Sequence, residues 1–232
     1  MTVTPTKLTR AAGLAAMAGG AIFVAVQIAH PNLTPELTTT TAWTVRQSAK
    51  IVMAVLSLIG ITGMYLRQTK QTGVLGLLGY LVFGAGYLVI LSFEAIGLFV
   101  LPALAKSSPG YVTDVLAVAV PGGHAVGDIG LLLPLSVASG VTYLGGGLVF
   151  GIALFRARIL ARWAAVLLAV GSLAPVGVVL LPQVNYRLFA IPTAVALIGL
   201  GFSLWREQRT AIAPSVAGST SVSAALDPVG AR

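Results

Sequence analysis

The sequence predicts an all-α fold, a polytopic transmembrane helical bundle of six spans. Three observations lead to this prediction: a mean hydropathy of +0.96, a hydrophobic fraction of 57% and a charged fraction of only 9%. Continuous apolar stretches occupy most of the chain, and a helix needs about 20 such residues to cross a hydrocarbon core about 30 Å thick. A soluble domain has no means of covering this much apolar surface.

The expected spans cover residues 8–29, 43–66, 73–104, 126–155, 159–181 and 187–205, joined by short connections. Together they form one transmembrane domain over residues 1–206. For the first span a cleaved signal peptide is the alternative, because Lys7 and Arg10 precede an apolar stretch. That stretch is long for a signal peptide, and no small-x-small cleavage site precedes His30. A retained span is therefore favoured.

A short surface helix is expected between the third and fourth spans. Ser108-Pro109 is typical of a helix start, and Pro121-Gly122-Gly123 is typical of a helix stop. Residues 111–120 are therefore predicted to lie as a helix on the membrane surface. Residues 207–232 lose the apolar pattern and are rich in Ala, Ser, Thr, Val and Pro, which predicts a disordered cytoplasmic tail.

Basic residues divide unequally between the two ends of the spans. One side collects Lys7, Arg10, Arg67, Lys70, Arg156, Arg158, Arg162, Arg206 and Arg209. The other side collects only Arg46, Lys50, Lys106 and Arg187. The positive-inside rule places the first set, and with it both termini, in the cytoplasm. Trp43, Trp163 and Trp205 fall at span ends, as expected of aromatic belts at the interfaces.

Composition also excludes several function classes. The formal charge of +8 sits mostly at span ends, where it sets topology and meets anionic lipid, so no nucleic-acid partner is expected. The chain has no cysteine, which excludes disulfides and thiolate metal sites. Prenyl-diphosphate, metalloprotease, P-loop and nucleophile-elbow motifs are absent, and no cofactor is expected. A bis-His haem would need His30 and His124, which are predicted at different span ends.

Glu94 is the most informative polar residue, because an ionisable group inside an apolar run is expensive and usually finds a partner. At about 1.5 Å of rise per residue, it lies roughly 32 Å above Gly73, close to the outer boundary. Arg46 lies at about the same height and Lys50 about 6 Å lower. Arg46 is therefore the leading predicted partner and Lys50 the second. An interfacial ion pair is the simpler interpretation, and a cation- or proton-binding carboxylate at an outer cavity is the alternative.

His124 and Asp128 form a second candidate group. They are four residues apart and share a helix face if the fourth span starts this early. Asp114 and Glu36 are expected on the same side, but nothing in this set has diagnostic metal-ligand spacing, so no metal site is predicted. Asp128 is also favoured at a helix start by the helix dipole alone.

Two further patterns concern packing and lipid. Gly147 and Gly151 form a small-xxx-small pair that allows close helix approach, within the chain or in a homo-oligomer. Arg156, Arg158 and Arg162 are a topology anchor and a candidate site for anionic lipid.

Three segments carry a resemblance to known proteins. Residues 39–46 (TTTAWTVR), 60–66 (GITGMYL) and 151–158 (GIALFRAR) resemble small six-span membrane proteins of actinobacteria, the high-GC Gram-positive bacteria. The resemblance covers the six spans and not the tail. It implies the bacterial plasma membrane and carries over no functional residue, because that group is uncharacterised.

Three function classes follow from these observations. The favoured class is a non-enzymatic membrane protein with a packing, partner-binding or envelope role, because polar residues avoid the middle of most spans. The second is a small transporter or channel using the outer polar residues, which normally requires polar groups near the midplane. The third is an intramembrane enzyme acting on a lipid or isoprenoid, for which no acid–base pair converges by spacing.

Overall fold

The computed structural model describes residues 4–28, 31–120, 122–177 and 185–210, and every regular element in these ranges is helical. Five helical segments are long and apolar enough to cross a membrane: α1 (Pro5–Gln27), α3 (Thr41–Arg67), α4 (Thr69–Phe99), α7 (Leu132–Ala157) and the segment Arg187–Glu207. That last segment joins η2 (Tyr186–Ala190) to α10 (Ile191–Thr210). The all-α prediction is confirmed, and the long apolar helices support a multi-pass membrane protein.

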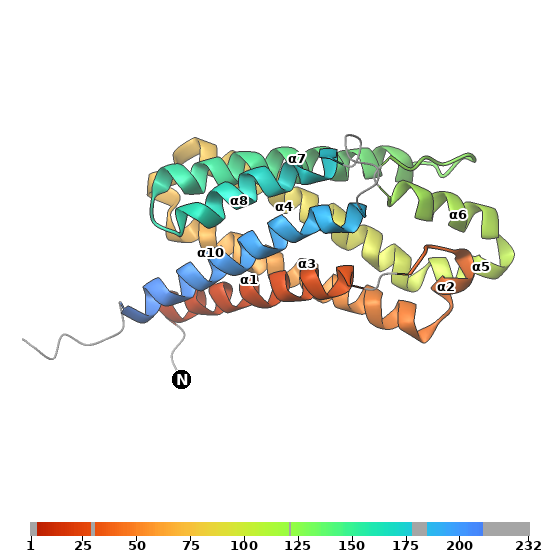
Figure 1. The fold of residues 1–232 in the computed structure, drawn as a ribbon, viewed down its shortest axis with the longest axis horizontal. Coiled ribbons are helices and arrows are strands. Elements are labelled where there is room, and N and C mark those ends of the chain that lie inside the picture. Colours follow the sequence, from red (N-terminus) through yellow and green to blue (C-terminus); the bar gives the residue numbers. More distant parts are fainter. Residues whose placement is uncertain (1–3, 29–30, 121, 178–184, 211–232) are drawn as a thin grey trace, which may run out of the picture.

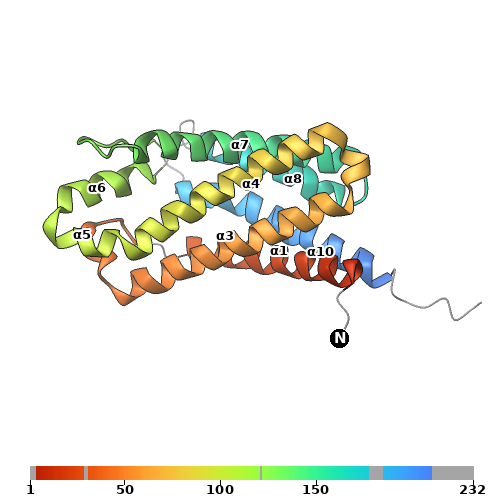
Figure 2. The same ribbon diagram turned by 180° about the vertical axis from the view of Figure 1, so that it is seen from behind.

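The helices form a closed ring in which each packs on its neighbours along the chain (Figures 1 and 2). The order is α1, α3, α4, α7, α8 (Arg162–Leu173) and α10, and α10 returns to pack against α1. Neighbours run antiparallel. Gly19 of α1 lies against Ser57 and Gly60 of α3 lies against Ala16, so the two helices pass in opposite directions. Large side chains such as Ile61, Phe83, Phe150 and Leu197 fill the centre.

The two ends of the bundle differ in composition. One end, called here the basic end, holds the start of α1, α4 and α8 and the end of α3, α7 and α10. There Arg67 donates through its guanidinium to both carboxylate oxygens of Glu207 and ties α3 to α10. The opposite end, called here the α6 end, carries α2 (Pro35–Thr38), α5 (Leu101–Ser107) and α6 (Pro109–Val118) (Figure 1). Apolar side chains of α5 and α6 form a second cluster with residues of α3 and of the loop before α7. Its buried members are Trp43, Leu101, Val112, Val115, Leu116 and Ile129.

Close glycine contacts hold most of the ring together. A Cβ at Gly146 of α7 would lie 2.3 Å from the backbone nitrogen of Phe83 in α4. One at Gly13 of α1 would lie 2.8 Å from the carbonyl oxygen of Gly201 in α10. Gly147 and Gly151 contact Ser172 and Ala169 of α8, so their small-xxx-small motif is used within the chain. Lipid supplies no hydrophobic force between helices, and such close packing is what drives their association.

Several predicted boundaries are corrected. The third span was expected to continue to residue 104, but α4 ends at Phe99 and α5 begins at Leu101. Pro102 has no N–H to continue the hydrogen-bond ladder, so the helix breaks there. Gly73, the expected start of that span, does mark a boundary. Its φ of 55° and ψ of −147° kink α4, in a conformation that glycine adopts at no steric cost.

The fourth span was expected from residue 126, but α7 begins at Leu132. The preceding segment is a loop held by side-chain acceptors. Asp114 of α6 accepts from the backbone N–H of Val126 and of Gly127, each at 2.9 Å, and Asp128 accepts from that of Gly130. Apolar composition alone gave no sign of these hydrogen bonds.

The region expected as the fifth span, residues 159–181, is a shorter apolar helix. It comprises α8 and the 3-10 turn η1 (Ala174–Val176), and residues 178–181 lie outside the described residues. Pro175 interrupts the α-helical ladder at this point. At the C-terminal side α10 extends to Thr210, so residues 207–210, which were expected in the disordered tail, are helical. Residues 211–232 are outside the described part of the chain.

The glycine contacts predict a sharp difference between two adjacent positions. Gly146→Ala should lower the free energy of unfolding by about 1–3 kcal/mol, because the new methyl group meets the backbone of α4, which has no room to shift. Gly145→Ala is the matched control: a Cβ there meets nothing within 4 Å. It should be neutral or stabilising, since alanine favours the helix. Thermal unfolding of the detergent-purified variants measures both, and equal stabilities would contradict the packing described.

Candidate ligand-binding cavity

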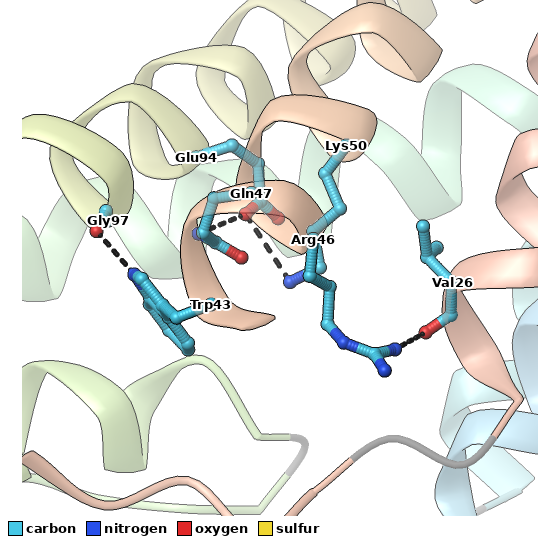
Figure 3. A network of polar contacts seen from close by, with 7 residues as sticks. All are labelled: Val26, Trp43, Arg46, Gln47, Lys50, Glu94 and Gly97. Carbon is cyan, nitrogen blue, oxygen red and sulfur yellow. Dashed lines mark hydrogen bonds and ion pairs between the residues drawn. The ribbon is translucent and has the colours of Figure 1, made fainter. Parts of the chain in front are cut away.

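A polar seam joins α3 to α4 near the α6 end (Figure 3). Trp43, Gln47 and Lys50 are spaced i, i+4 and i+7, so they share the face of α3 that looks toward α4. Gln47 donates to the Oε2 atom of Glu94 at 2.7 Å, and the Nζ atom of Lys50 pairs with the same oxygen at 3.3 Å. The Trp43 indole donates to the carbonyl of Gly97 at 2.8 Å.

Glu94 therefore has a basic partner, but it is the second of the two predicted. Arg46 turns toward α1 and donates to the carbonyl of Val26 at 2.7 Å (Figure 3). Counting the helical rise placed Arg46 at the right height along α3. It took no account of the direction in which the Arg46 side chain leaves the helix. Residue 46 is one position from Gln47, about 100° around α3, and so faces the other neighbour. The side chains of Lys50 and Glu94 are only 19% and 18% exposed, which makes this a largely buried pair.

The seam forms one wall of a cavity of about 340 Å³ inside the ring, called here the chamber. Its lining residues come from α1, α3, α4, α7, η1 and η2. Its charged residues are Lys50, Glu94 and Arg187. Its uncharged polar residues are Gln27, Tyr87, Ser139 and Tyr143. Phe23, Val26, Met53, Ile90 and Leu144 provide most of the apolar lining.

A second hollow of about 540 Å³, called here the vestibule, adjoins the chamber. The two share Ile90, Glu94, Ser139, Gly140 and Pro175 in their walls. The remaining wall of the vestibule is mainly apolar, with Phe93, Val118, Val120, Val137 and Val176. Val137 and Val176 are exposed. Glu94 therefore lines both hollows, while Lys50 and Arg187 line the chamber alone.

Tyr87 and Tyr143 line the chamber, and buried hydroxyl groups lie next to these two side chains. Tyr87 of α4 is fully buried, and its hydroxyl lies near that of Ser57 in α3. Tyr143 of α7 has Thr193 of α10 beside it in the same way. Ser57, Tyr87 and Thr193 make no well-aligned hydrogen bond there. Buried polar groups normally have partners, and these three hydroxyl oxygens, which are closed off from the cavity surface, are exceptions beside it in the described part of the chain.

The chamber begins where the glycine contacts stop. Going toward the α6 end, α4 and α7 last meet closely at Gly86 against Tyr143, and α1 and α10 at Gly20 against Ala194. Beyond this level larger residues line the gap, among them Phe23 and Ile90. Helices held apart by side chains leave space that helices touching through glycine do not.

His124 and Asp128 do not join this site. Their sharing a helix face required the fourth span to start before them, and it does not: both lie in the exposed loop before α7, where Asp128 stabilises the turn at Gly130. His30 lies outside the described residues. In the described part of the chain no three His, Asp or Glu side chains are placed to hold a metal ion. Glu36 stands apart on α2, where hydrogen bonding by its backbone, and then by Thr34, lowers the pKa of its carboxyl group.

Sequence reasoning missed several residues of the cavity. Gln47 was detectable, since it shares one helix face with Trp43 and Lys50. Tyr87 and Tyr143 were also detectable as hydroxyl-bearing side chains in the middle of apolar spans. Arg187 was counted only for topology, although η2 places it in the chamber wall. Its proximity to Lys50 and Glu94 depends on the return of α10 to α1, which no local pattern indicates.

Comparisons with known proteins add no further assignment. No family model, curated protein or solved structure matches this chain.

The seam makes a prediction for a double-mutant cycle. Glu94→Gln and Lys50→Gln should each destabilise the detergent-purified protein, because each leaves the other member as a largely buried charge. The double variant should lose less than the sum, with a coupling energy of about 1–3 kcal/mol. Arg46→Gln is the matched control, since it removes a neighbouring charge that contacts α1, and it should be additive with Glu94→Gln. Coupling of equal size in both cycles would contradict the assignment of Lys50 as the partner.

Proposed function

We propose that this chain is a six-span protein of the bacterial plasma membrane with both termini in the cytoplasm, and that its role is non-catalytic binding of a small ligand in the chamber. The observation that carries the binding role is the chamber itself. It is a hollow inside the ring that is lined by the charged residues Lys50, Glu94 and Arg187 and by uncharged polar residues, among them Gln27, Ser139 and Tyr143. Ligand sites are typically such concave, mostly apolar cavities of about 300–1,000 Å³ with a few polar groups.

Helix direction supports six crossings. The close contacts make α4 antiparallel to α7 and α1 antiparallel to α10, while α3 between α1 and α4 opposes both. Consequently α7 and α10 run in the same direction, and the chain must return between them. The described part of that return, Arg162–Val176, is about 22 Å long if helical throughout, and it packs against both α7 and α10. The resemblance to actinobacterial proteins supports the bacterial membrane.

Charge distribution supports the orientation. The basic end carries the larger set of Lys and Arg, which the positive-inside rule assigns to the cytoplasm, so the α6 end faces outward and α6 lies at the outer surface. At the cytoplasmic side, Arg162 stacks over the Phe155 ring at 4.2 Å, beside Arg156 and Arg158. This cluster remains the proposed contact with anionic lipid headgroups.

Binding is favoured over the two other classes. Transport needs an exit toward the cytoplasm, but the centre of the ring nearer the basic end is filled by fully buried Ile61, Met64, Phe150 and Leu154. The specific observation in favour of transport is the set of hydroxyls below the chamber, at Ser57, Tyr87 and Thr193. Enzymatic acid–base work is disfavoured because Glu94, the carboxylate in the chamber wall, is tied to Lys50 and Gln47.

Six crossings make a labelling prediction, and the cysteine-free sequence gives it a clean background. In intact cells a membrane-impermeant maleimide should label Ser108→Cys and Asn185→Cys, which lie at the α6 end. Gln71→Cys, at the basic end, should react only after permeabilisation. If the segment between α7 and α10 does not cross the membrane, Asn185→Cys will instead be protected in intact cells. Labelling of Gln71→Cys in intact cells would show that the orientation is the reverse of the one proposed.

The binding role is tested by photolabelling the purified protein with a medium-chain alcohol that carries a diazirine. Labelling should saturate, should fall on chamber residues such as Ile90 and Tyr143, and should be displaced by excess unlabelled alcohol. Tyr80 is the internal control. It lies on the same helix as Tyr87 but stacks on Tyr65 at a centroid distance of 4.6 Å, outside the chamber lining. Labelling that never saturates and spreads evenly over lipid-facing positions would contradict the proposal.

A further inference from the structure

We propose that the ligand is an uncharged, mostly apolar molecule that presents a hydroxyl group to the Lys50–Glu94 pair. This inference rests on the proposed binding function and adds the chemical class of the ligand and the wall that holds its polar group. The observation behind it is that Lys50 and Glu94 both line the chamber and that their ion pair leaves hydrogen-bonding capacity on each partner.

The contacts of the Glu94 carboxylate fall on one of its two oxygens (Figure 3). The Oε2 atom accepts from Gln47 and pairs with Lys50, whereas the Oε1 atom has no partner in the described part of the chain and is not buried. The Lys50 ammonium carries three N–H donors, and within the described ranges it contacts Glu94 alone. An unused acceptor and unused donors therefore lie side by side at one wall of the chamber.

A hydroxyl group matches this combination. It has one O–H donor and two acceptor lone pairs, so it can donate to the Oε1 atom of Glu94 and accept from the Nζ atom of Lys50 at the same time. Hydrogen bonds with an ionised partner are stronger than those between neutral groups. An ether of the same size accepts but does not donate, and it would leave the Oε1 atom without a partner.

The compensation of one charge by the other disfavours a charged headgroup. The Nζ atom of Lys50 and the Oε2 atom of Glu94 are 3.3 Å apart, so a carboxylate that approached the ammonium would also approach Glu94. An ammonium that approached Glu94 would likewise approach Lys50. Like charges repel more strongly where the site is largely buried and solvent screens them little. Arg187, the third charged residue of the lining, already has an interaction of its own.

The rest of the lining suits an apolar molecule with few polar groups. Phe23, Met53 and Ile90 contribute apolar side chains. Gln27 and Ser139 contribute uncharged polar groups that have no side-chain hydrogen bond among the described residues. The volume of about 340 Å³ lies at the lower end of the range for small-molecule sites, about 300–1,000 Å³. These properties favour an alcohol with a single apolar chain.

Competition against the diazirine alcohol tests the headgroup, with labelling of Ile90 and Tyr143 as the readout. The purified protein is kept in one neutral maltoside detergent at about pH 8, where decanoate is ionised and decylamine is protonated. Decanol should displace the probe at about tenfold lower concentration than decanoate, decylamine or methyl decyl ether, because each of these loses a hydrogen bond to a charged group or meets a like charge. Glycerol should not displace the probe, because it has hydroxyls and no apolar chain.

Three outcomes of this competition would overturn the proposal. One is equal displacement by decanol and methyl decyl ether, which would show that no donor is needed. Another is displacement by decanoate or decylamine that equals or exceeds that by decanol. The third is displacement by glycerol at the concentration at which decanol acts, which would indicate a water-soluble polyol instead of an apolar alcohol.

Two charge variants give a prediction specific to the ion pair. Glu94→Gln leaves Lys50 without its counter-charge, so the preference should move from decanol toward decanoate. Lys50→Gln leaves Glu94 without its counter-charge, so the preference should move toward decylamine. Each competitor partitions into the same detergent in every experiment, so a difference between variants reports the site. An unchanged order of competitors in both variants would contradict the role of the pair.

Two glycine variants locate the site without altering the ion pair. Gly140→Leu places a side chain in the chamber lining, at a position where a Cβ meets nothing within 4 Å, so it should fold normally and lose saturable labelling. Gly145→Leu lies on the same helix, is equally open and is outside the lining, so it should behave as the unmodified protein. A Gly140→Leu variant that is labelled saturably, with displacement by decanol unchanged, would refute the site.

The two proposals fail differently. If the diazirine alcohol labels Ile90 and Tyr143 saturably but decanoate or decylamine displaces it as well as decanol does, the chamber is a binding site and the hydroxyl class is wrong. If the alcohol never labels the chamber saturably, both proposals fall.

Discussion

Backbone contact at glycine is the constraint on which the rest of this structure depends. In a bilayer the hydrophobic effect does not hold helices together once they are inserted, so association relies on close packing and on polar contacts. Five of the six neighbour pairs in the ring use glycine in this way, from Gly13 against Gly201 at the closure of the ring to Gly146 against Phe83 between α4 and α7. These contacts need no partner molecule, since both sides belong to one chain.

The pair α3 and α4 follows a different rule. The glycines on these helices make no such backbone contact between them, and polar groups join them along their length: Trp43 with Gly97, Gln47 and Lys50 with Glu94, and Thr62 with Tyr80. An unpaired polar group in hydrocarbon is costly, so each contact also fixes the rotation of one helix against the other. Gly97 completes this seam, because a Cβ there would lie 2.3 Å from the Gln47 side chain.

The long helices were predictable from the sequence because each depends on a local property, a continuous run of apolar residues. The helix boundaries at Leu132 and Phe99 were harder to predict. The loop before Leu132 is held by Asp114, which accepts from the N–H of a residue twelve positions along the chain, and the end of α4 at Phe99 depends on Pro102, which breaks the turn before it. For the site, depth counting found Glu94 and both basic residues near it. It could not choose between Arg46 and Lys50, since that choice depends on which neighbour each face of α3 meets. The sequence could not place Arg187 in the chamber for a related reason: its position there depends on the closure of the ring by α10.

The positions of the glycines along the helices determine both where the helices pack closely and where the cavity lies. Toward the basic end, glycines bring the helices together and large side chains such as Ile61 and Phe150 fill the centre. Past Gly20 and Gly86, α1 is no longer in close backbone contact with α10, nor α4 with α7, and charged or hydroxyl-bearing side chains line the gap. The polar groups do not by themselves make this a catalytic site. The Oε2 atom of Glu94 is already engaged, because it accepts from Gln47 and pairs with Lys50. What remains is a fixed arrangement of a few charged and polar groups in a mostly apolar cavity, which is the composition typical of sites for small ligands.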